Sequence, residues 1–414
     1  MTDLAGRHVV LGVTGGIACY KACTVARRLT ESGAAVDVVM TASAAEFIRP
    51  VTFEALTGRP VVTSLWDPGH ALDHVRLGRE PDLIIVAPAT ARLIARAAQG
   101  LADDFLTSLL LARRSPLLIC PAMNDQMYAH PETQLNLEKI RGDRGVKGDR
   151  GVRGVRGVMV LGPASGPLAH GEGEGPGRMV EPEEIIAHAE RLLLSGPPFE
   201  GKRVLVTAGP TREALDPVRV VTNRSSGLMG YALAREAWRR GAEVTLIAGP
   251  GSLGAPFGVE VVRVESTGEL ATAVEKALPK ADVLIMAAAP ADYRPKKASA
   301  TKTKRSAGSM SLDLEPTPDV LKATVAKRKK GAVIVGFALE AGEAVASARE
   351  KLAAKQLDLV VANDATEPDA GPEVETNRVA LVAHDGVERL PLMSKEAVAE
   401  RIVDRVGVLL SGRG

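Results

Sequence analysis

Short apolar runs alternate with longer amphipathic stretches through the first half of the chain. Four runs are rich in Val, Ile and Leu, as buried parallel strands are: His8–Val13, Ala35–Met40, Asp82–Ala87 and Leu117–Cys120. Helical periodicity fills the intervals, at Ile17–Ser32, Leu93–Ala98 and Phe105–Ala112. This alternation predicts an α/β fold, doubly wound around a mainly parallel sheet.

Residues suited to hold an anion follow directly after these runs. Gly15 and Gly16 follow the first run, Ser43 the second, and Thr90 and Ala91 the third. Ligands of open α/β sheets bind at the carboxyl ends of the strands, and glycines there let backbone N–H groups approach a phosphate. The first turn lacks the full G-x-G-x-x-G spacing, and no acidic residue ends the second run. A mononucleotide phosphate therefore fits better than NAD.

The fourth run ends in Pro-Ala-Met-Asn-Asp-Gln-Met. Pro121 cannot extend a strand ladder, so we expect the chain to turn out of the sheet there. The amide of Asn124 could hold a carboxylate, and Met123 and Met127 could wall an apolar pocket. The alternative is a plain helix N-cap at Asn124 with two core methionines.

His74 falls in a polar stretch, residues 67–79, that we interpret as a loop before the third run. The pKa range of histidine suits a general base near neutrality. A solvated loop histidine is the commoner case, so the sequence leaves both interpretations open.

Two glycine-rich stretches lie before the boundary between the two halves. Residues 141–157 repeat Gly-Asp-Arg-Gly-Val-like units without helical or strand periodicity, which predicts an inserted flexible loop. Residues 162–179 are predicted to close over a site as a lid. A helix at Pro182–Leu194 is then broken by Ser-Gly-Pro-Pro, so we predict one domain over residues 1–195 and another over 196–414.

The second half repeats the strand–helix alternation and again predicts a mainly parallel, Rossmann-like sheet. Strands are expected at Arg203–Thr207, Glu243–Ala248, Val259–Val264, Asp282–Ala287, Val333–Phe337 and Asp358–Ala362. Helices are expected at Leu228–Arg240, Gly268–Leu278, Pro318–Lys330 and Glu343–Lys355.

Several groups in this half could bind phosphate. Asn223 opens an Asn-Arg-Ser-Ser-Gly stretch at a helix N-terminus, which suits an anion, although a plain cap needs only one of those residues. Lys302 lies in a stretch, residues 294–305, with basic residues and no acidic one, and Lys351 and Lys355 are four apart on one predicted helix face. These clusters suggest a triphosphate site or merely solvated charge. A Walker A motif is absent, which excludes a P-loop NTPase.

Composition limits the remaining choices. Apolar residues make up 45% of the 414 residues, and this length favours two domains. A net charge of +2 and 3% aromatic residues argue against a nucleic-acid partner. Three cysteines fit a reducing cytoplasm, and we expect neither a signal peptide nor a membrane span.

These stretches together resemble the bifunctional coenzyme A biosynthesis flavoproteins, in which phosphopantothenoylcysteine decarboxylase is joined to phosphopantothenate–cysteine ligase. The resemblance covers nearly the whole chain. It rests in the first half on Val13–Ala18, His74, Ala87–Ala91, Pro121–Asn124 and Gly175–Met179. In the second half it rests on Thr207–Gly209, Thr211–Glu213, Asn223–Gly230, Ala291–Arg294 and Ala362–Asp364.

The resemblance implies that the first domain binds FMN between the subunits of a trimer. Gly15, Gly16, Ser43, Thr90, Ala91 and Met123 match positions around the flavin. His74 is implied to assist oxidation of the substrate thiol, and Asn124 to hold the substrate carboxylate. The flavin carries the difficult redox chemistry, while the protein orients the substrate.

For the second domain the resemblance implies a dimeric ligase that uses CTP, cysteine and 4′-phosphopantothenate. Asn223 is implied to hold an acyl-cytidylate. Residues matching nucleotide contacts are Met286, Ala287, Ala288, Asp292, Lys302, Pro318, Asp319, Val320, Leu321, Phe337, Lys351 and Lys355. Mg²⁺ is expected mainly on the CTP phosphates, with Asp292 as a candidate ligand. The two symmetries together are compatible with a homo-oligomer as large as a dodecamer.

Two features depart from the family pattern. His170 stands where the lid usually carries the cysteine that donates a proton in the final reduction, and a thiol and an imidazole differ in reach and pKa. The other departure is the repeat at 141–157, which only lengthens a loop. An alternative is therefore an active ligase fused to a flavin domain with incomplete decarboxylase turnover. A flavin-binding regulatory module without enzyme activity is a third reading.

Overall fold

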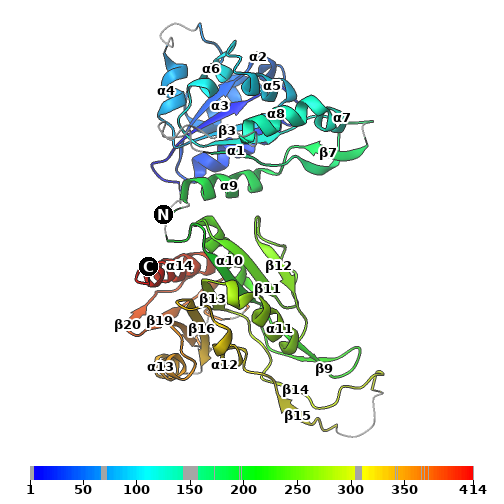
Figure 1. Cartoon of the computed structure of the whole chain (residues 1–414), viewed down its shortest axis with the longest axis vertical. Coiled ribbons are helices and arrows are strands. Elements are labelled where there is room, and N and C mark those ends of the chain that lie inside the picture. Colours follow the sequence, from blue (N-terminus) through cyan, green and yellow to red (C-terminus); the bar gives the residue numbers. More distant parts are fainter. Residues whose placement is uncertain are drawn as a thin grey trace. The chain divides into compact units, whose positions relative to one another are not determined.

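A computed structural model describes residues 4–66, 72–142, 157–171, 173–194, 196, 198–303, 310–340, 342, 344–364, 366–367, 369–371 and 373–413. Most of the predicted repeat loop, residues 143–156, lies outside this set. The chain forms two compact units, Met1–Leu193 and Leu194–Gly414, and each contains its own sheet (Figure 1).

The sheet of the first unit is parallel throughout, in the order β2-β1-β3-β4-β5. Its strands are β1 (His8–Val13), β2 (Ala35–Met40), β3 (Leu83–Ala89), β4 (Leu117–Pro121) and β5 (Val158–Val160). We expected this strand to end at Cys120 and the chain to turn out of the sheet at Pro121, but the strand includes Pro121. Pro121 pairs with Ala89 as the last residue of β4, because an end position needs no further ladder bond.

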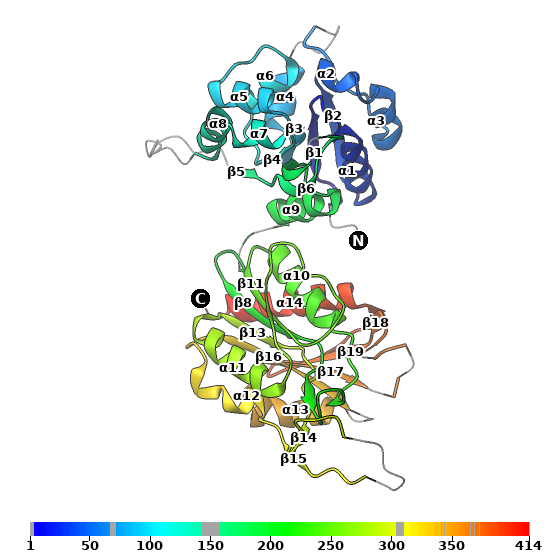
Figure 2. The same ribbon diagram turned by 90° about the vertical axis from the view of Figure 1, so that its right-hand side faces the viewer.

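Helices cover both faces of this sheet (Figure 2). Alternate residues of β1 point to opposite faces: Val9 and Leu11 join a core with α1 (Cys19–Glu31), α3 (Pro50–Thr57) and α9 (Pro182–Leu194). Val10 joins a second core with α4 (Asp73–Arg79), α5 (Ala91–Gln99), α6 (Phe105–Ala112) and α8 (Pro131–Arg141). The predicted doubly wound α/β class is thus confirmed for this unit.

Short elements complete the first unit. Two helices follow the second and fourth strands, α2 (Ala42–Ala45) and α7 (Asp125–Ala129). Residues 162–179, predicted as a lid loop, contain an antiparallel hairpin of β6 (Ala164–Pro167) and β7 (Glu174–Arg178). The hairpin was not predicted, because backbone pairing needs no apolar pattern in the glycine-rich chain. The role of this segment as a lid stays a prediction.

The second unit has a larger sheet with the order β12-β11-β8-β13-β16-β17-β19-β20. Its strands are β8 (Arg203–Ala208), β11 (Glu243–Ala248), β12 (Glu260–Arg263), β13 (Val283–Met286), β16 (Val333–Glu340), β17 (Leu359–Asp364), β19 (Val379–Ala383) and β20 (Gly386–Arg389). Pairing is parallel from β12 to β17 and antiparallel for the last two strands. The predicted mainly parallel sheet is confirmed, with an antiparallel edge that we did not predict.

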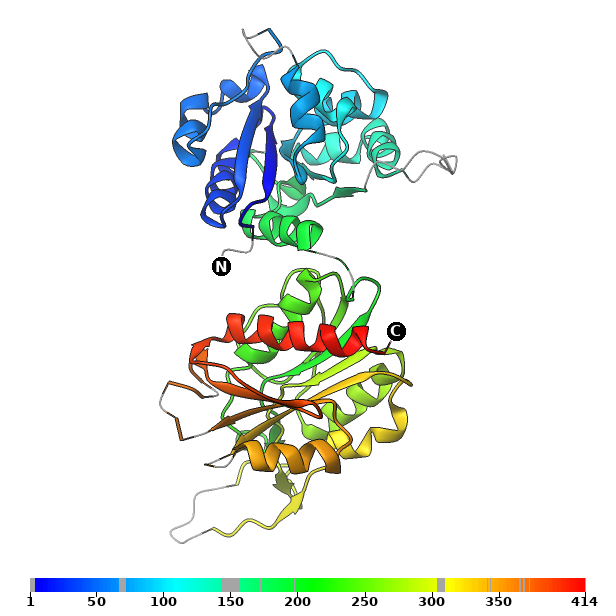
Figure 3. The same cartoon turned by 90° about the vertical axis from the view of Figure 1, so that its left-hand side faces the viewer.

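Helices flank this sheet on both faces (Figure 3). One face packs against α11 (Thr267–Ala277), α12 (Val320–Ala323) and α13 (Ala344–Ala354). On the other, α10 (Leu228–Arg239) packs against β8 and against the long helix α14 (Lys395–Ser411), which we did not predict. The remaining short elements are β9 (Arg212–Ala214), β10 (Val220–Thr222), β14 (Tyr293–Pro295), β15 (Leu314–Pro316), β18 (Thr376–Asn377), β21 (Met393–Ser394), η1 (Leu278–Lys280) and η2 (Val325–Lys327).

One predicted helix, Pro318–Lys330, is wrong in extent. Only α12 and the 3₁₀ turn η2 form there, separated at Thr324. The Thr324 hydroxyl donates to the Val320 carbonyl at 2.7 Å, and the Arg328 guanidinium donates to the Leu321 carbonyl at 2.9 Å. The Val320 carbonyl still accepts from the Thr324 N–H at 3.1 Å, but the Leu321 carbonyl, which the Val325 N–H would need in a continuing helix, is held by Arg328.

Candidate functional site

A cavity of about 860 Å³ lies at the carboxyl ends of β1 to β4 in the first unit. Its walls include every residue predicted to contact FMN, together with the predicted substrate ligand: Gly15, Gly16, Ser43, Thr90, Ala91, Met123 and Asn124. Pro167–Ala169 and Gly177–Met179 of the glycine-rich segment close one side. The expected juxtaposition of strand ends is therefore present, whereas the role of each residue remains a prediction.

The floor of the cavity is formed by closely packed turns. A Cβ atom added at Gly15 would lie 2.6 Å from the Ser43 Cβ, so only glycine fits where the first turn meets the second. The Thr14 hydroxyl donates to the Pro88 carbonyl at 2.7 Å and accepts from the Thr90 N–H at 3.2 Å, which ties the first and third strand ends together. Helix α1 has no side-chain cap at Ala18, and its Cys19 and Lys21 N–H groups donate to the Gly16 and Ala18 carbonyls, both at 3.0 Å. The positive end of the α1 dipole still points at the cavity.

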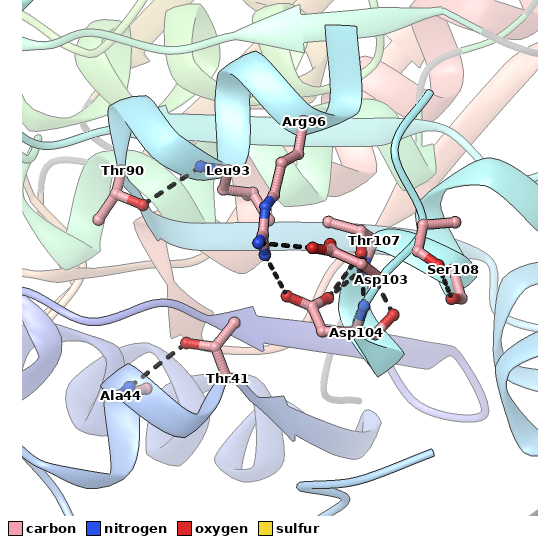
Figure 4. A network of polar contacts seen from close by, with 10 residues as sticks. Thr41, Ala44, Thr90, Leu93, Arg96, Asp103, Asp104, Thr107 and Ser108 are labelled. Atoms are coloured by element: carbon pink, nitrogen blue, oxygen red, sulfur yellow. Dashed lines mark hydrogen bonds and ion pairs between the residues drawn. The ribbon is translucent and has the colours of Figure 1, made fainter. Parts of the chain in front are cut away.

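A charged network fixes another wall (Figure 4). Arg96 on α5 contacts the Asp103 carboxylate at 2.6 Å and donates to that of Asp104 at 3.2 Å. Asp104 also caps α6 in a reciprocal box with Thr107. All three charged residues line the cavity. Sequence reasoning missed this network, although the short separation of Arg96 and Asp103 across the Gly100 turn was an available signal for it.

The hairpin is held against the cavity by contacts at its base. The Met123 N–H donates to the Gly177 carbonyl at 2.9 Å, and a Cβ added at Gly177 would lie 2.2 Å from the Met123 carbonyl oxygen. Lys21, only 4% exposed, donates to the Met179 carbonyl at 2.9 Å and to the Glu181 carboxylate at 3.0 Å. Sequence reasoning missed Lys21, because its partners lie about 160 positions away.

The two predicted catalytic histidines are not among the residues that line this cavity. His74 lies on α4 and not in a loop, because Asp73 pairs with Arg76 at 3.1 Å and Leu77 packs into the core. Its ring stands edge-on to Phe105 with 6.3 Å between centroids, and its buried Nδ1 has no hydrogen-bond partner among the described residues. His170 is exposed in the turn after β6.

Asn124 is a helix N-cap, as the simpler of the two predictions for it stated, and its amide could in addition bind a carboxylate. Its Oδ1 accepts from the Gln126 N–H at 2.9 Å as the N-cap of α7. Its Nδ2 makes no hydrogen bond within the described ranges, so the amide N–H₂ group can still donate to a ligand. Met123 and Met127 both line the cavity; Met123 also packs against the core that contains Val10, whereas Met127 is exposed.

In the second unit, several predicted nucleotide contacts lie together around Lys351. Its Nζ donates to the Phe337 carbonyl at 2.7 Å. Burial, reinforced by the neighbouring Lys355, lowers the pKa of Lys351, against the opposing charges of Glu340, Asp319 and Asp292. Lys355 pairs with Asp319 at 2.8 Å, and Asp319 caps α12.

Backbone bonds connect this cluster to the rest of the predicted site. The Thr317 N–H donates to the Asp292 carbonyl at 2.9 Å, which places the segment Pro318–Leu321 next to Asp292. The side-chain amide of Asn223 donates to the Pro290 carbonyl at 2.8 Å. The serine hydroxyls of the predicted anion site accept from the Gly227 and Leu228 N–H groups and thus act as local caps. Lys302 is exposed.

Two further observations bear on ligands. Within the described ranges, no group of three or more His, Cys, Asp or Glu side chains could hold a metal ion. A second cavity, of about 600 Å³, lies beside Asn363 and Asp364 and is lined by none of the predicted nucleotide contacts. Among all residues that the structure describes, no helix has the length and apolar character needed to cross a membrane.

Comparison with known proteins assigns both units. Residues 1–193 match the model of the flavoprotein family, and residues 199–409 match that of the DNA/pantothenate metabolism flavoprotein C-terminal domain. The coenzyme A biosynthesis bifunctional protein CoaBC of Vibrio cholerae is 44% identical over 97% of this chain and 98% of its own. CoaBC of Mycobacterium tuberculosis is 47% identical over 98% and 97%. The crystal structure of a CoaBC C-terminal domain is 40% identical, with a TM-score of 0.45 over 52% of this chain and 98% of that one.

The two matches define a two-unit enzyme in which a flavoprotein decarboxylase precedes a ligase. The chain belongs to the family of coenzyme A biosynthesis bifunctional proteins CoaBC. The predicted family, the predicted enzyme class and the flavin cofactor are thereby confirmed.

Proposed function

We propose that this enzyme catalyses two successive steps of coenzyme A biosynthesis. Residues 196–414 join cysteine to 4′-phosphopantothenate with CTP through an acyl-cytidylate, and residues 1–195 decarboxylate the product to 4′-phosphopantetheine with FMN. The observation that carries the proposal is the 860 Å³ cavity, whose walls unite all seven residues assigned to the flavin and the substrate carboxylate. The site is a small-molecule site, and the expected cellular location is the cytoplasm.

In the first unit, each wall of the cavity has a separate task. The turn at Gly15 and Gly16, with Ser43, would hold the FMN phosphate, because its N–H and hydroxyl groups donate at a helix N-terminus. Thr90, Ala91 and Met123 would flank the ring, and the free Nδ2 of Asn124 would donate to the substrate carboxylate. When bound, FMN supplies the oxidation and the final reduction of the substrate.

His74 would reach the reaction from a second copy of the chain. It does not line the cavity of its own unit, yet its Nδ1 is buried and lacks a partner among the described residues. The residue as a whole is only half-buried, so the rest of its ring could face the cavity of a neighbouring copy. That position would suit the proposed trimeric arrangement of the decarboxylase, to which dimeric ligase contacts would add.

In the second unit, the positive charges of Lys351, Lys355 and Lys302 would neutralise the CTP phosphates. Asn223 would hold the acyl-cytidylate with its amide. Because no protein cluster suited to a metal occurs in the described ranges, Mg²⁺ would be bound mainly by the phosphates, with Asp292 beside them.

The test follows CMP and CO₂ separately in one preparation supplied with CTP, cysteine and 4′-phosphopantothenate. His74→Ala should abolish CO₂ release and leave CMP release intact, since the histidine belongs to one unit only. Asn223→Ala and Lys302→Ala should lower CMP release to a small, measurable residual rate, yet leave decarboxylation of added phosphopantothenoylcysteine unchanged. Wild-type protein that releases neither product, or variants that lose both activities together, would contradict the proposal.

A second candidate function is an active ligase joined to a decarboxylase that does not complete its catalytic cycle. Its support is the exposed position of His170, outside the cavity walls, where the family pattern expects a proton-donating cysteine. In that case the flavin would stay reduced after the first turnover. Recovery of the oxidised flavin absorbance, with stoichiometric 4′-phosphopantetheine, would eliminate this candidate.

A further inference from the structure

The segment that carries Lys302 is tied to the loop between β9 and β10. Asp216 in that loop is 2% exposed, although aspartate is rarely buried without a partner. Its Oδ1 accepts from the Val218 and Arg219 N–H groups, both at 2.9 Å, and so closes the turn after Pro217. This much is ordinary turn chemistry and uses one carboxylate oxygen.

The other carboxylate oxygen serves a distant part of the chain. Oδ2 of Asp216 accepts from Nε and Nη2 of Arg219 at 2.9 and 2.6 Å, and also from the Thr303 N–H at 3.2 Å. Nη2 of Arg219 donates in addition to the Thr303 carbonyl at 2.7 Å. Both backbone groups of Thr303, 87 positions beyond Asp216, are therefore held by this one ion pair.

A second bond holds the same segment from its other end. The Ser299 N–H donates to the Leu215 carbonyl at 2.9 Å, so residues 299 and 303 are both bonded to the loop 215–219. Lys302 lies between these two residues and directly precedes Thr303, which makes more hydrogen bonds to the loop than Ser299 does. The backbone that carries Lys302 is thus held on both sides, while the Lys302 side chain is exposed.

We propose that Asp216 and Arg219 are positioning residues for the ligase reaction, which hold the Thr303 backbone and thereby direct Lys302 toward the nucleotide phosphates. The inference rests on the proposed role of Lys302. Charge-assisted hydrogen bonds are short and directional. An ion pair in which two guanidinium nitrogens share one carboxylate oxygen, and which also holds a peptide group, therefore restricts the adjacent residue more than a surface contact would. The bond from Arg219 also keeps the pKa of Asp216 well below its usual range, so the pair stays ionised at neutral pH.

The experiment compares Asp216→Asn and Arg219→Lys with a matched control in the full-length enzyme. Asparagine retains an Oδ1 acceptor for the turn but removes the charge, and lysine retains the charge but not the two-pronged contact. Glu243→Gln is the control, because it removes the exposed ion pair with Arg203 in the same unit. Ligation is measured as CMP release at varied CTP concentration. Decarboxylation is measured as CO₂ release from added phosphopantothenoylcysteine.

We expect both test variants to lower kcat/KM for CTP by about a hundredfold, the usual effect of a misplacement near 1 Å. Amide exchange in residues 299–303 should become faster, while decarboxylation and the control variant should stay at the wild-type level. Adding either substitution to Lys302→Ala should cause no further loss, since residues that act through one another are not additive. A purely structural role would instead add to the Lys302→Ala loss.

Two results would overturn the inference. One is wild-type ligation with unchanged amide exchange in both variants; the other is full additivity with Lys302→Ala. Absence of CMP release from the wild-type enzyme would be a different result, because it contradicts the proposed function itself. If Asp216→Asn unfolds the turn, Arg219→Lys still decides the question, since the Asp216 acceptors of the turn N–H groups remain.

Discussion

The tight packing around Gly15, in the cavity proposed for FMN, yields the sharpest prediction. In Gly15→Ala, the added Cβ would lie 2.6 Å from Cβ and 2.7 Å from both C and O of Ser43. Ordinary contacts begin near 3.4 Å, so the first turn would have to move away from Ser43 by several tenths of an ångström. Two of the three atoms are backbone, which rules out relief by a rotamer change.

The expected magnitude follows from the cost of overpacking, which is typically about 1–3 kcal/mol. Gly15 and Ser43 both line the cavity at the proposed phosphate position, so the displacement should act mainly on cofactor affinity. That cost corresponds to a Kd for FMN raised by about 5- to 150-fold. Ligation should be unaffected, because the strained contacts all lie in the first unit.

The assay is titration of flavin-free protein with FMN, followed by flavin fluorescence. Gly157→Ala serves as the control, because it adds the same methyl group in the same unit with no atom of the described residues within 4 Å. The reasoning is refuted if Gly15→Ala binds FMN as tightly as Gly157→Ala does. It is also refuted if Gly15→Ala loses CMP release to the same extent as flavin affinity.

Three further predictions concern other contacts. Lys21→Met should raise KM for decarboxylation without changing ligation. It removes the bonds from Lys21 to Met179 and Glu181 at the base of the hairpin, and such charge-assisted bonds contribute about 1.5–3 kcal/mol. The measurement is steady-state CO₂ release, and an unchanged KM would contradict the prediction. Burial raises the pKa of Asp37, but hydrogen bonds from His8 and Arg59 outweigh burial and lower the pKa to about 2. The lowered pKa of Asp37 means that its ionised form stabilises the fold above about pH 4, and that this stabilisation is lost as the pH falls through 2. In Asp37→Asn, thermal stability should therefore decline less between about pH 4 and pH 2 than in the wild type. Parallel curves of melting temperature against pH for the variant and the wild type would contradict this prediction. Gly249→Ala should abolish ligation and spare flavin content, because its Cβ would lie 1.8 Å from the Pro210 carbonyl oxygen, whereas Gly251→Ala, with no neighbour within 4 Å, should ligate normally.

Strand positions and the location of the cavity could be predicted from the sequence, and the reason is local. A strand buried on both faces is a continuous apolar run, so β1 to β4 were visible without knowledge of their partners. Parallel strands must then place Gly15, Ser43, Thr90 and Asn124 at one edge. Helix α14 carried comparable signals that we overlooked, a Ser394 cap and a regular apolar face. The Asp385-Gly386 turn likewise marked the antiparallel pair β19–β20.

The contacts that give each site its shape could not be predicted, because they join residues far apart in sequence. Lys21 meets Glu181, and Asp216 with Arg219 meets Thr303, across separations of 160 and 84 to 87 positions. Hydrophobic periodicity carries no information on such polar pairs. The same bonds all fall within one unit or the other, the first pair in Met1–Leu193 and the second in Leu194–Gly414. A substitution that breaks one of these bonds should therefore alter one activity, while the other activity reports whether the chain is still folded. A chain with two activities thus allows an effect on the position of a site residue to be separated from an effect on the stability of the fold.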